Sequence, residues 1–318
     1  MSTTEHPTAT GARVGRPAFH AHAVMHCNLN TTDGERAAAF YMAAFGVEPR
    51  MRSVERQGDA TPLGLQGAIA STTTFLYDRR GPRSAPALEL VDWDVPATTP
   101  AWPGSVDSAF QAVGFRVPSL RHFQSRAVAL GHPCTEVAGG LLARGRRVPA
   151  LRTVDLDGVV VEVIESPPGP GDPQSDGVLA HERMVAVDLA ETLAWYETIG
   201  WAVLSSGTES GVPWASLVLP DDPTFTLEFS QAPLSPGTPR NAVTRGLYRV
   251  ALAVEDVREA ASALRADGGC GEVPEPSFIP MVDTPTGGFT VLFLRDPNGA
   301  VVELVERPRG EMSRPTAP

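Results

Sequence analysis

The chain has 318 residues, of which 42% are hydrophobic, and a formal net charge of −11. This length allows two domains with apolar cores. An acidic chain without a basic run is a poor candidate for binding nucleic acid or an anionic membrane, and no apolar stretch is long enough to predict a transmembrane helix. The three cysteines are widely spaced, which favours free thiols in a cytoplasmic protein.

A strand and a helix are expected after a disordered tail at residues 1–19. The tail has no apolar segment of the kind found in a secretory signal. The stretch HCNLNTTDGERAAAFYMAAFG starts at His26, which is expected to lie on a short strand. Thr32 and Glu35 fit a capping box at the start of a helix, and Gly46 fits the position just after its end.

Two further strands carry a glutamate each. The segment PALELVDW (86–93) contains Glu89, and the segment DLDGVVVEVIE contains Glu162. The pair Asp157-Gly158 predicts a type I′ hairpin turn, and the β-branched residues that follow predict a strand. A carboxylate on an otherwise apolar strand face needs compensation. Glu162 is therefore interpreted either as an edge residue that reaches water or pairs with arginine, or as a metal ligand.

The segment SPPGPGDPQSDG (166–177) predicts a linker, and the pattern before it then recurs. His181 precedes a helix whose start fits a second capping box, formed by Asp188 and Glu191. An aromatic-tyrosine pair follows at the same offset from the histidine in both halves. The strands TFTLEFSQ (224–231) and DPNGAVVELVE supply Glu228 and Glu303. Residues 307–318 are expected to be a second tail.

Each half divides again into two units. The segments 110–131 and 247–269 both predict a strand, a helix and a glycine stop. Four units of a strand, a helix and about three strands are thus expected, and a repeat of this kind defines an architecture.

This pattern resembles the vicinal oxygen chelate superfamily, which includes glyoxalase I, extradiol dioxygenases and bleomycin resistance proteins. The resemblance implies an α+β fold of four βαβββ modules that form two paired, open-barrel domains, each able to surround a metal. We expect these domains at residues 20–165 and 178–306. The superfamily scaffold alone does not fix the reaction.

The resemblance also implies metal ligands on the first and last strands of the modules. In the first domain these are His26, Glu89 and Glu162, with Glu89 and Glu162 as catalytic carboxylates. A second set consists of His181, Glu228 and Glu303. The fourth ligand position departs from the family pattern, because it falls on Ala112 in the first domain and on Arg249 in the second. His20 and His22 share strand parity with His26, so these histidines also fit a polar strand face.

One histidine and two glutamates suit one divalent ion that acts as a Lewis acid, such as Zn, Ni, Co, Mn, Mg or Fe(II). We therefore expect an isomerase, epimerase or lyase that moves a proton on a small oxygenated metabolite. Such an enzyme is expected to be a monomer or a homodimer. A metal-free binding protein of the resistance type and a ring-cleaving oxygenase are the alternatives. Arg249 would repel a cation, so the first domain is the expected active site.

Overall fold

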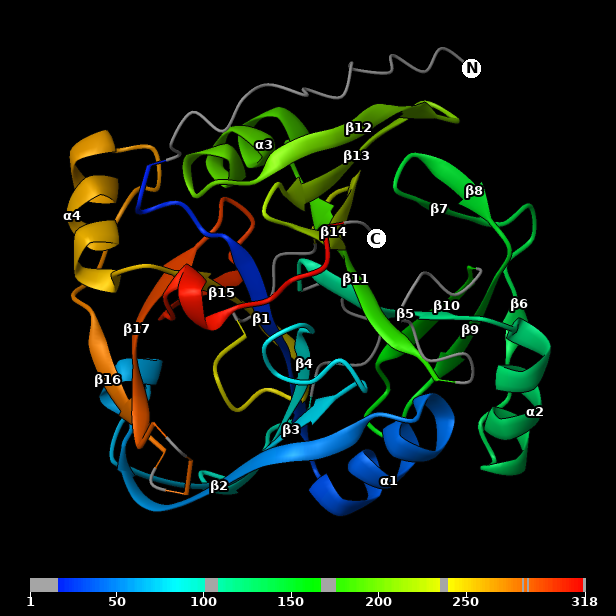
Figure 1. The fold of residues 1–318 in the computed structure, drawn as a ribbon, viewed down its shortest axis with the longest axis horizontal. Coiled ribbons are helices and arrows are strands. Elements are labelled where there is room, and N and C mark those ends of the chain that lie inside the picture. Colours follow the sequence, from blue (N-terminus) through cyan, green and yellow to red (C-terminus); the bar gives the residue numbers. More distant parts are fainter. Residues whose placement is uncertain are drawn as a thin grey trace.

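The computed structural model describes residues 17–100, 108–166, 176–234, 240–281, 283–284 and 286–316. Four modules follow one another along the chain (Figure 1). The first contains β1 (Ala23–Thr31), α1 (Gly34–Phe45), β2 (Glu48–Asp59), the short helix η1 (Thr61–Leu63), β3 (Ala68–Tyr77) and β4 (Ala87–Val95). The second contains β5 (Phe110–Val117), α2 (Leu120–Ala129), β6 (Thr135–Glu136), β7 (Leu141–Ala143), β8 (Arg146–Val148), β9 (Ala150–Val154) and β10 (Val160–Glu165).

The third and fourth modules repeat this order. The third contains β11 (Val178–Ala186), α3 (Leu189–Thr198), β12 (Ala202–Glu209), β13 (Val212–Leu219) and β14 (Asp222–Gln231). The fourth contains β15 (Gly246–Val254), α4 (Val257–Asp267), β16 (Ser277–Pro280), β17 (Gly288–Arg295) and β18 (Val301–Glu306), and the short helix η2 (Arg309–Glu311) follows it. The expected α+β class and the four modules are confirmed.

The modules pair in an unexpected way. One eight-stranded sheet has the order β16-β17-β18-β15-β1-β4-β3-β2, so it combines the first and fourth modules. The other has the order β12-β13-β14-β11-β5-β10-β9-β6 and combines the second and third. We call these the β1/β15 barrel and the β5/β11 barrel, after the antiparallel strands that join the modules (Figure 1). The prediction of two barrels from residues 20–165 and 178–306 is therefore wrong.

Helix packing explains how neighbouring modules stay together although they belong to different barrels. Tyr41 of α1 donates a hydrogen bond to Asp155 of the second module, with 2.8 Å between Oη and Oδ2. Tyr196 of α3 donates to Asp296 of the fourth module at 3.4 Å. The two repeated Asp-containing turns are thus anchored by the tyrosines of the repeated helices. Burial raises the pKa of Asp155 to about 6, although the Tyr41 hydrogen bond opposes this shift.

The helix starts and the hairpin turns follow the sequence closely. Asp188 caps α3 as expected and Asp256 caps α4, but the cap of α1 is Asp33 rather than Thr32. The turn at residues 157–158 is not type I′, because only Gly158 has a positive φ, of 84°. The Asp155 carboxylate instead accepts the backbone N–H groups of Asp157 and Val159, which closes the turn.

The end of the chain is packed rather than disordered as far as the structure describes it. Arg314 is almost fully buried and lies 3.1 Å from the Asp222 carboxylate, and the backbone of Ser313 donates to the carbonyl of Arg83. The prediction of a disordered tail at 307–318 is thus wrong for residues 307–316. Residues 1–16 of the expected first tail and 167–175 of the expected linker lie outside the described residues.

Each barrel strand turns one face to the barrel interior and the other to the core. On β1, Cys27 and Leu29 belong to an apolar cluster that extends through both barrels and the helices, whereas His26 and Asn28 point the other way. None of the described helices is long and apolar enough to cross a membrane.

One carboxylate departs from this division. Glu182 is the residue of β11 that corresponds to Cys27, and it is fully buried against that thiol. Apart from the Cys27 thiol, neither of its carboxylate oxygens meets a hydrogen-bond donor among the described residues. Burial raises the pKa of Glu182 well above its usual value. The folded protein therefore holds this group in its neutral form more readily than the unfolded chain does.

We predict that Glu182→Gln raises the free energy of unfolding at pH 8. A carboxyl group with a raised folded-state pKa destabilises the fold increasingly as pH rises above about 4.3, the unfolded value. Removal of the charge should therefore stabilise the protein by on the order of 1–3 kcal/mol at pH 8 and by less at pH 5.5. Urea unfolding at the two pH values measures this, with exposed Glu165→Gln as the matched control. Equal effects of the two substitutions at both pH values would contradict the prediction.

Candidate functional site

The predicted ligands meet in different groups from those expected. His26, Glu89 and Glu303 converge inside the β1/β15 barrel, where His26 Nε2 lies 3.3 Å from an oxygen of each carboxylate. Glu162 and His181 meet inside the β5/β11 barrel, with 3.0 Å between Oε2 and Nε2. The sets His26, Glu89, Glu162 and His181, Glu228, Glu303 are therefore not assembled. The inward orientation of the six side chains follows from strand parity, but their grouping follows from module pairing.

Arg249 lies at the centre of the first group. Its Nε donates to Glu303 Oε2 at 2.8 Å, and its Nη2 donates to both oxygens of Glu89 at 3.0 and 2.8 Å. The guanidinium is 6.0 Å from the centroid of the Phe293 ring. Asn28, which faces Arg249 across β1 and β15, donates to Glu89 at 2.9 Å. We call His26, Asn28, Glu89, Arg249 and Glu303 the first cluster, and all five residues are buried.

The charges in the first cluster stabilise one another. Burial alone would raise the pKa of Glu303, but Arg249 and the hydrogen bond with His26 hold this pKa below its usual value. Burial alone would lower the pKa of Arg249, but Glu89 and Glu303 raise it. A buried carboxylate and guanidinium in such geometry form charge-assisted hydrogen bonds.

A divalent metal does not fit the first cluster as it is built. The Arg249 guanidinium lies between the two carboxylates that a cation would bridge, and its charge opposes a second cation within a few ångströms. No group of three or more His, Cys, Asp or Glu side chains in the described part of the chain is arranged to hold a metal. Arg249 would have to leave before His26, Glu89 and Glu303 could act as ligands.

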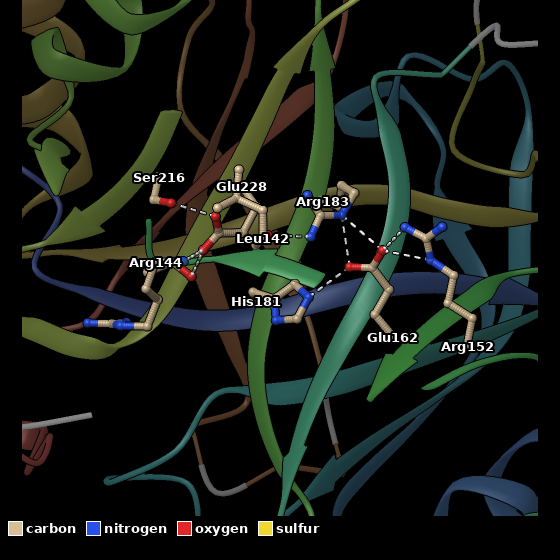
Figure 2. Close-up of polar contacts among 9 residues, drawn as sticks. Leu142, Arg144, Arg152, Glu162, His181, Arg183, Ser216 and Glu228 are labelled. Atoms are coloured by element: carbon tan, nitrogen blue, oxygen red, sulfur yellow. Dashed lines mark hydrogen bonds and ion pairs between the residues drawn. The ribbon is translucent and has the colours of Figure 1, made fainter. Parts of the chain in front are cut away.

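The second barrel contains an arginine at the same place, but from another strand (Figure 2). Arg183 of β11 donates through Nε to both oxygens of Glu162, at 2.9 and 2.8 Å, and Arg152 of β9 also donates to this carboxylate. Burial alone would raise the pKa of Glu162, but the hydrogen bond with His181 and the charge of Arg183 hold it well below its usual range. The interpretation of Glu162 as a carboxylate paired with arginine agrees with this geometry.

The two arginines occupy complementary positions. Asn28 is the register partner of Arg249, and Arg183 is the register partner of Ala112. Ala112 of β5 and Arg249 of β15 hold the same position in their modules. Asn28 of β1 and Arg183 of β11 likewise hold the same position in theirs. Ala112 thus leaves room that Arg183 fills, rather than an open coordination position. Arg183 follows His181 by two residues, and this His-x-Arg spacing on a strand was the sequence signal for its inward position.

The β5/β11 barrel is partly covered by its own chain. The hairpin of β7 and β8 lies over its interior, where the backbone N–H of Arg144 donates to Glu228 and the carbonyl of Leu142 accepts from Arg183 (Figure 2). Ser216 and Thr226 also donate to Glu228, so its carboxylate accepts three hydrogen bonds. A cleft of about 770 Å³ lies beside this cluster. Arg152, Arg183 and Glu228 line this cleft, but Glu162 and His181 do not.

The β1/β15 barrel instead contains a cavity of about 210 Å³ that reaches the first cluster. His26, Glu89, Arg249 and Glu303 all line this cavity. Its walls are mainly apolar and include Met25, Met51, Ile69, Phe75, Val91, Trp93, Ile279, Phe289, Val291, Phe293 and Val305. Ser53, Glu55, Asp59, Ser71 and Thr73 are polar residues that also line it. His22 takes no part, because its Nε2 meets the carbonyl of Arg307 at 3.0 Å. The cavity makes this barrel the candidate functional site.

The fold and the site define a protein of paired βαβββ modules, in which each barrel encloses a His-Glu cluster held by arginine. Residues 178–304 match the model of the Glyoxalase/Bleomycin resistance protein/Dioxygenase superfamily, so the resemblance drawn from the sequence is confirmed over this part of the chain. No curated protein matches the chain at a significant level.

Solved structures extend this likeness to nearly the whole chain. Glyoxalase I from Zea mays superimposes with a TM-score of 0.66 at 18% identity, over 91% of this chain and 92% of that chain. A putative dioxygenase from Bacillus subtilis gives a TM-score of 0.64 at 12% identity, over 93% of this chain and 92% of that chain. At such identities the likeness establishes the fold alone.

We predict that an arginine at position 28 can replace the arginine at position 249. Arg249→Ala leaves two buried carboxylates without their cation and should cost about 3–5 kcal/mol of unfolding free energy. Asn28→Arg in the same variant places a guanidinium where Arg183 stands in the other barrel, and should recover at least half of that loss. Urea unfolding measures both changes. Asn28→Leu with Arg249→Ala is the control, and equal recovery by leucine would refute the equivalence of the two positions.

Proposed function

We propose that the chain binds a small, mainly apolar molecule in the cavity of the β1/β15 barrel, and that Arg249 replaces a bound metal in this site. The observation that carries the proposal is the ion pairing of one guanidinium with both Glu89 and Glu303 at the end of an apolar cavity. Ligand sites are typically apolar hollows with a few converging polar groups, and this cavity has that composition.

The size of the cavity sets the size of the ligand. An apolar cavity of about 150 Å³ admits benzene. The cavity here measures about 210 Å³, which suits a single ring with a short substituent. Aromatic and methionine side chains of β2, β3, β16 and β17 form part of its walls, and such side chains pack well against a flat ring. The proposed function corresponds to binding or sequestration of a metabolite, with or without a reaction.

A filled cavity should abolish this binding. Val91 of β4 lines the cavity on the same strand face as Glu89, so Val91→Trp should occupy the space of a ring. We expect ethylbenzene to bind the parent protein and to lose at least tenfold in affinity for Val91→Trp, as followed by ligand NMR. Val187→Trp, at an exposed position outside the cavity, is the matched control. Undiminished binding to Val91→Trp would place the ligand elsewhere.

A second candidate is a metal-dependent lyase or isomerase that uses His26, Glu89 and Glu303. The convergence of one imidazole and two carboxylates within 3.3 Å favours it, because this donor set suits a divalent Lewis acid. Such a function requires Arg249 to withdraw from both carboxylates. Metal binding by the parent protein therefore distinguishes the two candidates.

We predict that Arg249→Gln binds Co²⁺ and that the parent protein does not. The substitution removes the competing charge and leaves His26, Glu89 and Glu303 as ligands, so Co²⁺ should raise the Tm of the variant by mass action. Visible absorption of Co²⁺ and thermal unfolding provide two readouts, and the triple variant Arg249→Gln, Glu89→Gln, Glu303→Gln is the control. Stoichiometric Co²⁺ binding by the parent would favour the metal-dependent enzyme instead.

A further inference from the structure

The guanidinium of Arg249 has one nitrogen left for a ligand. Nε and Nη2 are used by Glu303 and Glu89, whereas Nη1 makes no hydrogen bond within the described residues. Arg249 is one of the residues that line the cavity, so Nη1 is the guanidinium nitrogen that remains available to a ligand there. A guanidinium donates and never accepts. The group that meets it must therefore be an acceptor.

The surrounding charges decide which acceptor is favoured. The charge of Arg249 is already compensated by Glu89 and Glu303, because both carboxylates accept hydrogen bonds from its guanidinium. A second anion brought beside Glu89 and Glu303 would be repelled in a site with little water. A neutral acceptor oxygen avoids this repulsion and still receives the hydrogen bond. Free carboxylate and phosphate groups are thus disfavoured at this end of the cavity.

We infer that the ligand of the β1/β15 barrel is an uncharged aromatic or alicyclic carbonyl compound, whose carbonyl oxygen accepts a hydrogen bond from Arg249 Nη1. This inference rests on the proposed function, because it specifies the ligand of the same cavity. The ring lies among the apolar walls, and the oxygen points to the cluster. Arg249 then serves two purposes, since it neutralises the buried carboxylates and selects the polar end of the ligand.

Three probes of nearly the same size and shape separate the elements of this inference. Ethylbenzene has no oxygen, acetophenone has a neutral carbonyl and benzoate has a charged carboxylate. Dissociation constants for the parent protein come from ligand NMR titration. We expect acetophenone to bind at least tenfold more tightly than benzoate.

To measure what Arg249 contributes to ligand affinity, we use a variant without the charged groups of the cluster. Replacement of Arg249 and Glu89 by methionine and of Glu303 by leucine keeps the volume of the cluster, and apolar replacement of a complete buried ionic group is often tolerated by a fold. We expect this triple variant to bind ethylbenzene more tightly than the parent does, because its cavity lining is more apolar. The ratio of acetophenone to ethylbenzene affinity should fall at least fivefold. Circular dichroism confirms that the variant is folded.

The variant Glu89→Gln tests whether the cluster repels anionic ligands. Glutamine keeps the shape of the side chain and removes one negative charge from the cluster. Benzoate affinity should rise tenfold or more, whereas acetophenone affinity should change less than threefold. An unchanged benzoate affinity would refute the charge argument.

The outcomes distinguish the inference from the function on which it rests. If none of the three probes binds the parent protein, the proposed function fails. If ethylbenzene binds and depends on Val91 as expected, but the acetophenone preference is the same in the parent and the triple variant, the function stands. In that case the carbonyl inference alone is wrong.

Discussion

Carboxylates buried inside the two barrels require a cation, and the rest of the site depends on how each barrel supplies one. An ionised glutamate removed from water costs several kcal/mol unless a partner compensates it. Glu162 and Glu303 are both buried, and each pairs with an inward arginine, Arg183 for Glu162 and Arg249 for Glu303. The position of Arg249 or Arg183 then determines which carboxylates are bridged, which donors remain free and how much space is left for a ligand.

An arginine is not equivalent to the metal that this kind of cluster could hold. A divalent ion would balance both carboxylates and would accept lone pairs from a substrate oxygen. The guanidinium of Arg249 balances only one charge and offers N–H groups in a fixed plane. It also cannot dissociate from the chain, so the site is assembled whenever the protein is folded. The barrel thus gains permanent hydrogen-bond donors and loses the strong Lewis acidity of a metal.

The sequence predicts the modules well because their signals are local. The strand parity of His26, Glu89, Glu162 and Glu303 correctly turns these residues inward, and the capping aspartates mark two of the helix starts. The pairing of the modules, in contrast, does not follow from such local signals. The first strands of the four modules, β1, β5, β11 and β15, have similar apolar faces, and any two of them could pair along an edge. The periodicity of the sequence therefore does not show which first strand pairs with which. For this reason the first cluster contains Glu303 and not Glu162, which was predicted there.

The role of arginine was harder to predict for a related reason. Arg249 is at a position that suggests an inward side chain, but its partner carboxylates depend on the pairing of the modules. Arg183 is recognisable only when it is placed opposite Ala112, because the small side chain creates the space that the long one fills. A strand residue therefore has to be interpreted together with its neighbour across the sheet.

The two barrels share a topology but differ in their openings. The cavity of the β1/β15 barrel reaches its His-Glu cluster, whereas the cleft beside the β5/β11 barrel is not lined by Glu162 or His181. Modules of the same barrel are joined through β-strands, and consecutive modules are joined through the contacts of Tyr41 with Asp155 and of Tyr196 with Asp296. One apolar core therefore extends through both barrels, and neither needs a ligand to hold the fold together. The β7–β8 hairpin can cover Glu162 and His181 in one barrel while the other keeps a cavity at its charged cluster. Because the covered barrel shares this core, it can support the walls of the other, whose charged cluster then serves recognition.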